Sequence, residues 1–172
     1  MKIGLFGGSF DPVHLGHVKL CEYFFKTLSL DKVFVIPAFI SPFKVEKPPR
    51  VSGKNRYEML KLAFNDFSNV EISAFEIESK GISYTIDTVK HFLKNYPNDQ
   101  IYLLLAKELE PDFPKWKNYQ ELKSLVKIEY GPMIEPINST MVRERLSRNE
   151  SCKEIISPKV LDYIEKLHLY SS

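Results

Sequence analysis

Apolar positions along the chain follow two alternating patterns. Short, nearly continuous apolar runs are typical of buried strands, whereas apolar residues three or four positions apart indicate helices with one buried face. The runs predict strands over residues 2–6, 32–37, 70–73, 100–106 and 126–130. The helical spacing predicts helices over residues 15–28, 54–64, 85–96, 119–125, 140–147 and 158–167.

The repeated order of strand and then helix predicts an α/β fold with a parallel sheet and right-handed crossovers. We expect a sheet of about five strands, helices on both faces and a small C-terminal helical segment. The proline-rich stretch over residues 38–53 is too long for an ordinary connection, and we interpret it as a functional or mobile loop. Ligands of such sheets bind beyond the carboxyl ends of the strands, where loops begin at Gly7, Ala38, Ser73, Ala106 and Gly131.

Composition narrows the class of protein. The length of 172 residues fits one domain, with a core expected over residues 1–135 and a C-terminal segment over residues 136–172. The 24 basic and 22 acidic residues leave a net charge of only +2, which disfavours nucleic acid and favours phosphate on a small ligand. Cys21 and Cys152 suit neither a disulfide framework nor a metal site. No apolar run has the length of a membrane span and no signal pattern opens the chain, so we expect a cytoplasmic protein.

The loop after the first predicted strand combines glycines, a hydroxyl and two histidines in the run G-G-S-F-D-P-V-H-L-G-H. Gly7 and Gly8 permit unusual backbone conformations and a close approach that side chains would block. His14 and His17 are three residues apart, so they share one face of the first helical turn. A helix N-terminus attracts anions, and imidazoles there can donate hydrogen bonds to phosphate. A helix cap with two surface histidines is the alternative, and the combination of features favours a phosphate site.

The run N-S-T-M-V-R-E-R-L-S-R near the C-terminus is a second candidate for phosphate binding. Ser139 and Thr140 lie at a predicted helix start and are followed by Arg143, Arg145 and Arg148. Cations at that end oppose the helix dipole unless a bound anion reverses the sign. Taken alone the run would fit a solvated basic face, but beside the histidine loop we interpret it as a phosphate contact.

These two runs resemble the signatures of the H-x-G-H nucleotidyltransferases, with Asn138 where many relatives have serine. More narrowly, the runs GISYTIDTV, FPKWKNYQEL and V-x-x-Y-I-x-x-x-x-L-Y resemble the bacterial nicotinate mononucleotide adenylyltransferases. The resemblance implies a Rossmann-like nucleotidyltransferase fold. It also implies a reaction in NAD biosynthesis that joins ATP and nicotinate mononucleotide into nicotinate adenine dinucleotide and releases pyrophosphate. The catalytic residues it implies are His14, His17 and Arg143, and the ATP contacts are Gly7, Gly8, Ser9, Phe10, His14, Gly16, His17, Ser139, Thr140 and Arg143.

The acceptor contacts implied by the resemblance are Lys44, Tyr84, Thr85 and Trp116. On physical grounds Thr85 can cap the helix that follows it, and the open N–H groups there would suit a small carboxylate. Trp116, the only tryptophan, can stack on a flat heteroaromatic ring, with packing at the core edge as the alternative. Lys44 can reach a phosphate as a mobile point charge, or it is an ordinary solvated lysine.

The implied reaction needs neither a nucleophilic side chain nor a general base, because the acceptor phosphate is already ionised. Catalysis then consists of positioning and of stabilising charge on the phosphoryl oxygens. We expect Mg²⁺ as a cofactor held mainly through ATP phosphates, since the sequence has no carboxylate cage. Asp11 is a lesser candidate ligand, and we favour a structural role for it. The expected partners are ATP and nicotinate mononucleotide, with a homo-oligomer left open and neither nucleic acid nor a membrane.

Several positions depart from the pattern of the family. Phe43 replaces the usual histidine, A-K-E at residues 106–108 replaces G-x-D, and E-Y at residues 129–130 replaces an arginine. Arg56 matches an arginine of relatives, with a surface role as the alternative. The departures leave two other functions open. One is adenylyl transfer to another phosphorylated acceptor, such as phosphopantetheine or nicotinamide mononucleotide, and the other is nucleotide binding without catalysis.

Overall fold

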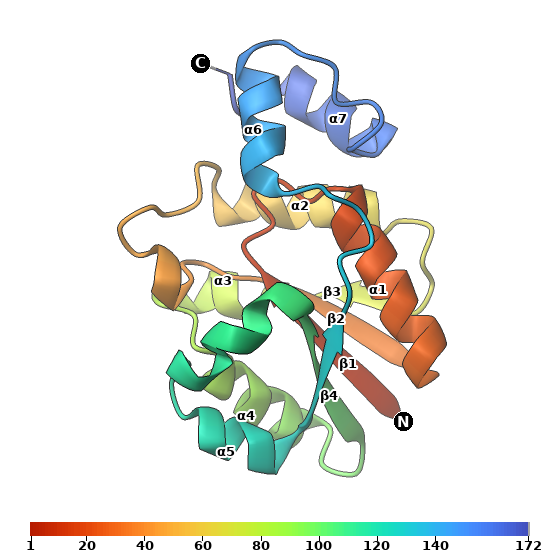
Figure 1. Ribbon diagram of the computed structural model, residues 1–172, viewed down its shortest axis with the longest axis vertical. Coiled ribbons are helices and arrows are strands. Elements are labelled where there is room, and N and C mark those ends of the chain that lie inside the picture. The colour runs from red at the N-terminus through yellow and green to blue at the C-terminus, as the bar shows by residue number, and fades with distance from the viewer. Residues whose placement is uncertain (172) are drawn as a thin grey trace.

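The computed structural model describes residues 1–171 and contains a parallel sheet of five strands in the order β3-β2-β1-β4-β5 (Figure 1). Every strand pair in it is parallel, which confirms the α/β class that the alternating patterns predict. The strands are β1 (Lys2–Gly8), β2 (Lys32–Pro37), β3 (Val70–Ile72), β4 (Gln100–Ala106) and β5 (Lys127–Gly131).

Helices cover both faces of the sheet, as the sequence predicts. One face carries α1 (Leu15–Leu28) and α2 (Gly53–Ala63), and the opposite face carries α4 (Thr85–Asn95) and α5 (Tyr119–Leu125). The short helix α3 (Phe75–Ser79) lies beside α4. The C-terminal helices α6 (Ser139–Ser147) and α7 (Pro158–Lys166) lie above α1 and α2 at the top of Figure 1, where α7 packs on α2. Within residues 1–171, no helix combines the length and the apolar character needed to cross a bilayer.

Two apolar cores flank the sheet because alternate side chains of a strand point to opposite faces. Phe6 of β1 and Leu104 of β4 belong to the core beneath α1, α2 and α7. Their neighbours Leu5 and Leu103 belong to the core beneath α4 and α5. The central strands are thus held from both sides, and their carboxyl ends form a fixed edge on which loops can be placed.

The long periodic segments match the prediction closely. Helices α1 and α5 and strands β2 and β4 have the predicted bounds, and the other predicted elements differ by one or two residues at an end. Three short elements were not predicted, namely α3 and the 3-10 turns η1 (Pro42–Lys44) and η2 (Lys107–Lys115). The stretch 38–53 is therefore not wholly irregular, since η1 lies within it. Both 3-10 turns contain proline, and α3 is too short to show an apolar period.

Gly131, the last residue of β5, lies against α1 with no room for a side chain. A Cβ atom there would lie 2.7 Å from Cζ of Phe24, and nearer still to a methyl group of Leu20. Because both neighbours are buried, we expect Gly131→Ala to lower the free energy of unfolding by about 1–3 kcal/mol, as overpacking does. Urea unfolding measures this. Gly81→Ala is the control, because a Cβ at Gly81 would meet nothing within 4 Å. Equal stability of the two variants would contradict the packing.

Candidate active site

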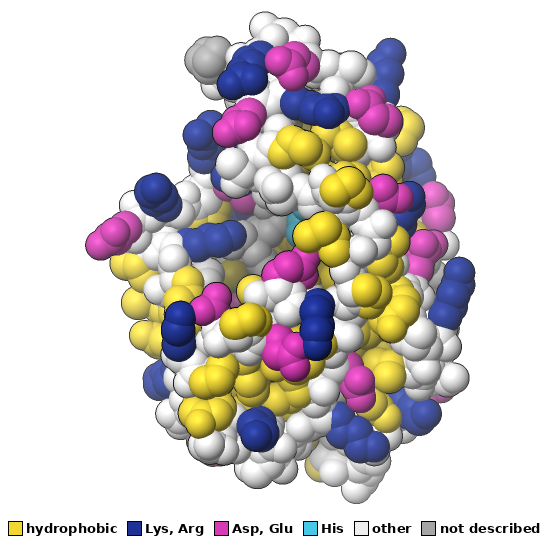
Figure 2. Space-filling model, viewed as in Figure 1, with side chains coloured by type: hydrophobic (Ala, Val, Ile, Leu, Met, Phe, Trp, Pro, Cys, Tyr) yellow, Lys and Arg dark blue, Asp and Glu magenta, His cyan; other side chains and the backbone are white. Residues whose placement is uncertain are grey.

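Two cavities open at the carboxyl edge of the sheet and meet at the loop after β1. The first has a volume of about 820 Å³ and lies between that loop, η2 and the N-terminal end of α6. It is the hollow in the middle of Figure 2, inside which a histidine is visible. Every residue expected to contact ATP lines it, namely Gly7, Gly8, Ser9, Phe10, His14, Gly16, His17, Ser139, Thr140 and Arg143.

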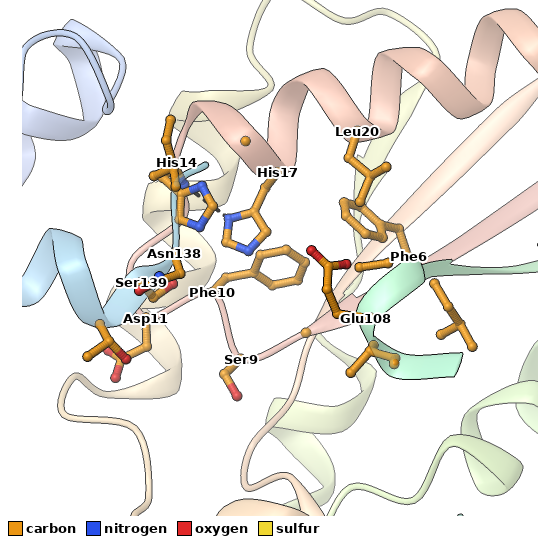
Figure 3. Close-up of a pocket in the computed structure, with 18 of the residues that line it drawn as sticks. Phe6, Ser9, Phe10, Asp11, His14, His17, Leu20, Glu108, Asn138 and Ser139 are labelled. Atoms are coloured by element: carbon orange, nitrogen blue, oxygen red, sulfur yellow. Dashed lines mark hydrogen bonds between the residues drawn. The ribbon is translucent and has the colours of Figure 1, made fainter. Parts of the chain in front are cut away.

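His14 and His17 lie together at the start of α1, where His14 is the N-cap residue (Figure 3). Their rings are stacked, with centroids 3.7 Å apart. The backbone N–H of His14 donates to Nδ1 of His17 at 3.1 Å. Because Nδ1 accepts this bond, the proton of the neutral His17 ring lies on Nε2, which can donate to a ligand. Nδ1 of His14 is buried and has no partner within residues 1–171.

Burial keeps both imidazoles neutral. It lowers the pKa of His14 from its ordinary 6.5 to about 4. The pKa of His17 is lowered well below its ordinary value, first by burial and then by the neighbouring His14 and Lys44. Neutral rings avoid the penalty of burying two charges side by side, yet each can still donate a hydrogen bond to an anion.

The glycines of the histidine loop act by leaving space. No glycine within residues 1–171 has a positive φ, and the positive φ of this loop, 47°, belongs to Phe10. The predicted unusual backbone conformation at Gly7 and Gly8 is therefore wrong, while a close approach remains available. A Cβ at Gly7 would have its nearest neighbour 3.9 Å away, so it would extend into open space. At Gly16 a Cβ would lie 3.0 Å from the His14 ring, so a side chain there would displace the imidazole.

Helix α6 is attached to the histidine loop by its first turn. Asn138 caps the helix, since its Oδ1 accepts from the backbone N–H three residues later at 2.8 Å. The hydroxyl of Ser139 donates to the carbonyl of Pro12 at 2.9 Å, and Nη1 of Arg143 donates to the carbonyl of Asp11 at 2.8 Å. Nε of Arg143 is buried and has no partner among the described residues. Arg143 thus lines the first cavity with one N–H of its guanidinium left without an acceptor.

The other two arginines of this run do not line the first cavity. Arg145 forms an ion pair with Glu154 at 2.7 Å, and Arg148 lies 4.0 Å from Glu150. Both pairs are at the surface, so the basic-face interpretation holds for Arg145 and Arg148. Of the three arginines, Arg143 is the one that lines the first cavity.

Arg56 has a role that the sequence did not suggest. Its side chain is only 1% exposed, so the alternative of a surface role is wrong. The guanidinium donates to the carbonyls of Ser9 at 2.8 Å, Ala38 at 2.6 Å and Phe39 at 3.2 Å. It ties the loop after β1 to the loop after β2, which makes it a positioning residue. The resemblance singled out Arg56, but no local sequence signal predicted that its side chain would be buried between two loops.

Asp11 is structural, in line with the role favoured for it. Its Oδ1 accepts from the hydroxyl of Tyr170 at 2.6 Å, and its Oδ2 accepts from the backbone N–H of Arg50 at 2.8 Å. Both oxygens are thus engaged by the protein, which leaves Asp11 unsuited to a metal. Across residues 1–171, no three His, Cys, Asp or Glu side chains are grouped in a way that could hold a metal ion.

The second cavity has a volume of about 670 Å³ and lies between η1, the N-terminal end of α4 and η2. All four expected acceptor contacts line it: Lys44, Tyr84, Thr85 and Trp116. Helix α4 begins at Thr85 with Tyr84 as its N-cap residue, so the prediction that Thr85 caps the helix is wrong. No side chain caps this end, and the backbone N–H groups of Thr85 and Ile86 have no acceptor within residues 1–171. The open helix end that the sequence predicted is therefore present.

An aromatic wall closes one side of the second cavity. Trp116 packs against the buried Phe113 with ring centroids 5.4 Å apart, as the core-edge alternative predicts, and it also lines the cavity. Phe43, which is 58% exposed, lies 6.5 Å from Trp116 between centroids. Lys44 is not freely solvated, because its Nζ donates to the hydroxyl of Ser9 at 3.1 Å. Burial and the nearby Arg143 lower the pKa of Lys44.

Of the residues that depart from the family pattern, Phe43, Ala106 and Glu108 line the first cavity, whereas Lys107, Glu129 and Tyr130 do not. Glu108 lines that cavity, and its carboxylate points into it in Figure 3. In the segment that replaces the family's arginine, the ring centroid of Tyr130 lies 5.7 Å from Nζ of Lys107. The histidine pair and Arg143 are untouched by these changes.

Comparison with known proteins agrees with this geometry. Residues 5–145 match the family described as cytidylyltransferase-like. The nicotinate-nucleotide adenylyltransferase of Bacillus subtilis (strain 168) is 32% identical over 188 residues, which cover 99% of this chain and 99% of that protein. A "probable nicotinate-nucleotide adenylyltransferase" of Shouchella clausii (strain KSM-K16) is 34% identical, over 98% of this chain and 96% of that protein. The chain belongs to the nicotinate-nucleotide adenylyltransferase family.

A solved structure shows the same fold. The nicotinic acid mononucleotide adenylyltransferase of Plasmodium falciparum, complexed with NaAD, superposes with a TM-score of 0.81. Its identity is 20%, and the match covers 98% of this chain and 97% of that one. The nicotinate-nucleotide adenylyltransferase resemblance inferred from the sequence is confirmed, together with the Rossmann-like fold that it implied.

The neutral histidines should make the stability of this family member depend on pH. His14 takes up a proton near pH 6.5 when unfolded but only near pH 4 when folded. The stability that depends on neutral His14 is therefore complete above pH 6.5 and is lost as the pH falls toward 4, by up to about 3 kcal/mol. His14→Asn should reduce this loss in urea unfolding between about pH 7 and about pH 4. His168→Asn, at an exposed histidine, is the control. An undiminished loss in His14→Asn would show that His14 is not buried in its neutral form.

Proposed function

We propose that this protein joins ATP to nicotinate mononucleotide, giving nicotinate adenine dinucleotide and pyrophosphate. The observation that carries the proposal is the junction of the two cavities. Gly7, Gly8, Ser9, Phe43 and Lys44 line both of them. A nucleotide in the first cavity and an acceptor in the second cavity would bring their phosphates together beside Gly7 and Gly8. These glycines have no side chain that would separate the two phosphates.

The reaction needs no nucleophile from the protein. An oxygen of the acceptor phosphate, already ionised, attacks the α-phosphorus of ATP in line, and the bond to pyrophosphate breaks. The protein's part is to position the reactants and stabilise charge on the phosphoryl oxygens. Nε2 of His17 and Nδ1 of His14 would contact those oxygens, because both have unused hydrogen-bonding capacity at the cavity. Nε of Arg143 and Nζ of Lys44 would contact the triphosphate.

The acceptor cavity suits a pyridine ring with an acidic group. Trp116 offers a flat surface on which the ring can stack. The open end of α4 at Thr85 offers two backbone N–H groups to a carboxylate, in the favourable field of the helix dipole. Nicotinate has this carboxylate and nicotinamide does not, so these features together favour nicotinate mononucleotide.

Mg²⁺ fits this site as a companion of the nucleotide. The described residues supply no carboxylate cage, and both oxygens of Asp11 are engaged, so the metal would be held by the ATP phosphates and water. There it would neutralise part of the charge on the departing pyrophosphate.

We also propose that the chain works as a single domain, with residues 136–172 completing the nucleotide cavity formed by the core over residues 1–135. Residue 172 lies outside the described part. The contacts of Ser139 and Arg143 with the histidine loop, and that of Tyr170 with Asp11, support the proposal that the C-terminal segment completes the cavity.

Pyrophosphate release tests the proposed function. The protein would be mixed with ATP, Mg²⁺ and one of three acceptors: nicotinate mononucleotide, its amide or phosphopantetheine. We expect release with nicotinate mononucleotide at the highest kcat/KM. A higher kcat/KM with another acceptor would reassign the substrate, and ATP binding without release in any mixture would mean that the protein only binds nucleotide.

His17→Ala tests the role of the imidazole pair. Loss of one preorganised donor to the phosphoryl oxygens should lower kcat by about 10²-fold or more, with a smaller change in KM. His91→Ala is a matched control, because His91 stacks on Phe75 at 3.9 Å and lines neither cavity. Near-normal turnover in His17→Ala would remove the proposed role.

A further inference from the structure

The rim of the acceptor cavity carries a lysine whose position the reaction does not explain. Lys117 directly follows Trp116 and lines the same cavity. Its Nζ lies 4.1 Å from the ring centroid of Tyr84. Tyr84 is the N-cap residue of α4, and Thr85, the first residue of that helix, lines the same cavity as Lys117. If a ligand ring stacks on Trp116, a substituent that points toward the N-terminal end of α4 would meet both the helix end and the ammonium of Lys117.

The other charges that line this cavity are already engaged. Lys115 forms an ion pair with Asp112 at 2.7 Å, and Lys44 donates to Ser9 on the phosphate side. Glu76 accepts from the hydroxyl of Thr88 at 2.6 Å. Burial raises the pKa of Glu76, which reduces its negative charge.

Lys117 differs from these residues because it forms no ion pair within residues 1–171. Its Nζ instead contacts the face of Tyr84, which attracts the ammonium through the ring quadrupole and uses no N–H donor in a conventional hydrogen bond. This contact keeps the cation near the helix end while its three donors stay available to an anion.

We propose that Lys117 is a specificity-determining residue that selects an acceptor with a carboxylate on its ring over the corresponding amide. This inference rests on the proposed function. A carboxylate held by the N–H groups of Thr85 and Ile86 gains a second, fully charged partner in Lys117. A neutral amide gains no Coulombic attraction, and its own N–H groups face a cation that can only donate.

The effect of Lys117 belongs to binding more than to the chemical step. The ring carboxylate is remote from the phosphate that attacks ATP, so the attraction is equal in the ground state and the transition state. Such an interaction changes KM and leaves kcat nearly unchanged. Because Lys117 is exposed at the rim, we expect it to favour the acid over the amide by about five- to tenfold.

The test compares Lys117→Met with Lys115→Met, using kcat and KM for nicotinate mononucleotide and for nicotinamide mononucleotide. Lys115 is the matched control, because it is also exposed and lines the same cavity but is paired with Asp112. Trp116, the only tryptophan, gives a second readout, since quenching of its fluorescence reports the Kd of each acceptor without turnover. Lys117→Arg retains the charge and should retain most of the selectivity.

Lys117→Met should raise KM and Kd for the acid about five- to tenfold, leave those for the amide within about twofold, and keep kcat and the melting temperature unchanged. Added salt should weaken the acid selectivity of the unmodified enzyme but not that of Lys117→Met. Equal loss for acid and amide, or an equal effect of Lys115→Met, would overturn the inference while the proposed function stands. Failure of the unmodified protein to use nicotinate mononucleotide would overturn both.

Discussion

The buried guanidinium of Arg56 is the interaction on which both cavities depend. A charge so far from water is tolerated only when its donors are satisfied, and here backbone carbonyls on either side of the cavity junction satisfy them. Ser9 lines both cavities, and Ala38 lines the acceptor cavity. Because one rigid planar group holds all three, the two loops keep a fixed spacing, and that spacing sets how two phosphates can meet.

The sequence predicted those parts of the fold that have a full apolar period. Helix α1 and strand β4 were placed correctly because their burial is visible in every turn or pair of residues. Short elements with proline or few apolar positions, such as η2, carry no such period. At the site, the histidine loop was recognisable because its functional residues follow one another closely in the sequence. The buried positioning role of Arg56 was not recognisable, because its partners come from two loops distant in sequence. The cap of α4 was misplaced by one residue, since Tyr84 is the N-cap residue and Thr85 begins the helix.

The nucleotide cavity holds unsatisfied groups ready for a ligand. Nδ1 of His14 and Nε of Arg143 are buried without partners among residues 1–171, and each such atom is unfavourable in the free protein. Because these atoms are buried away from water, the hydrogen bonds that they form with an anion are also stronger. On the acceptor side, the backbone N–H groups at the uncapped start of α4 are likewise without partners among the described residues. The protein thus gives up some stability in order to present donors that need no rearrangement when substrate arrives.

The bond between Tyr170 and Asp11 joins residues 159 positions apart in the chain. During synthesis the histidine loop leaves the ribosome long before residue 170 does, because the chain is made from its amino end onward. The carboxylate beside the histidine loop nevertheless gains its tyrosine partner only after residue 170 has emerged. The pocket beside the histidine loop therefore lacks this fastening until residue 170 is available to Asp11.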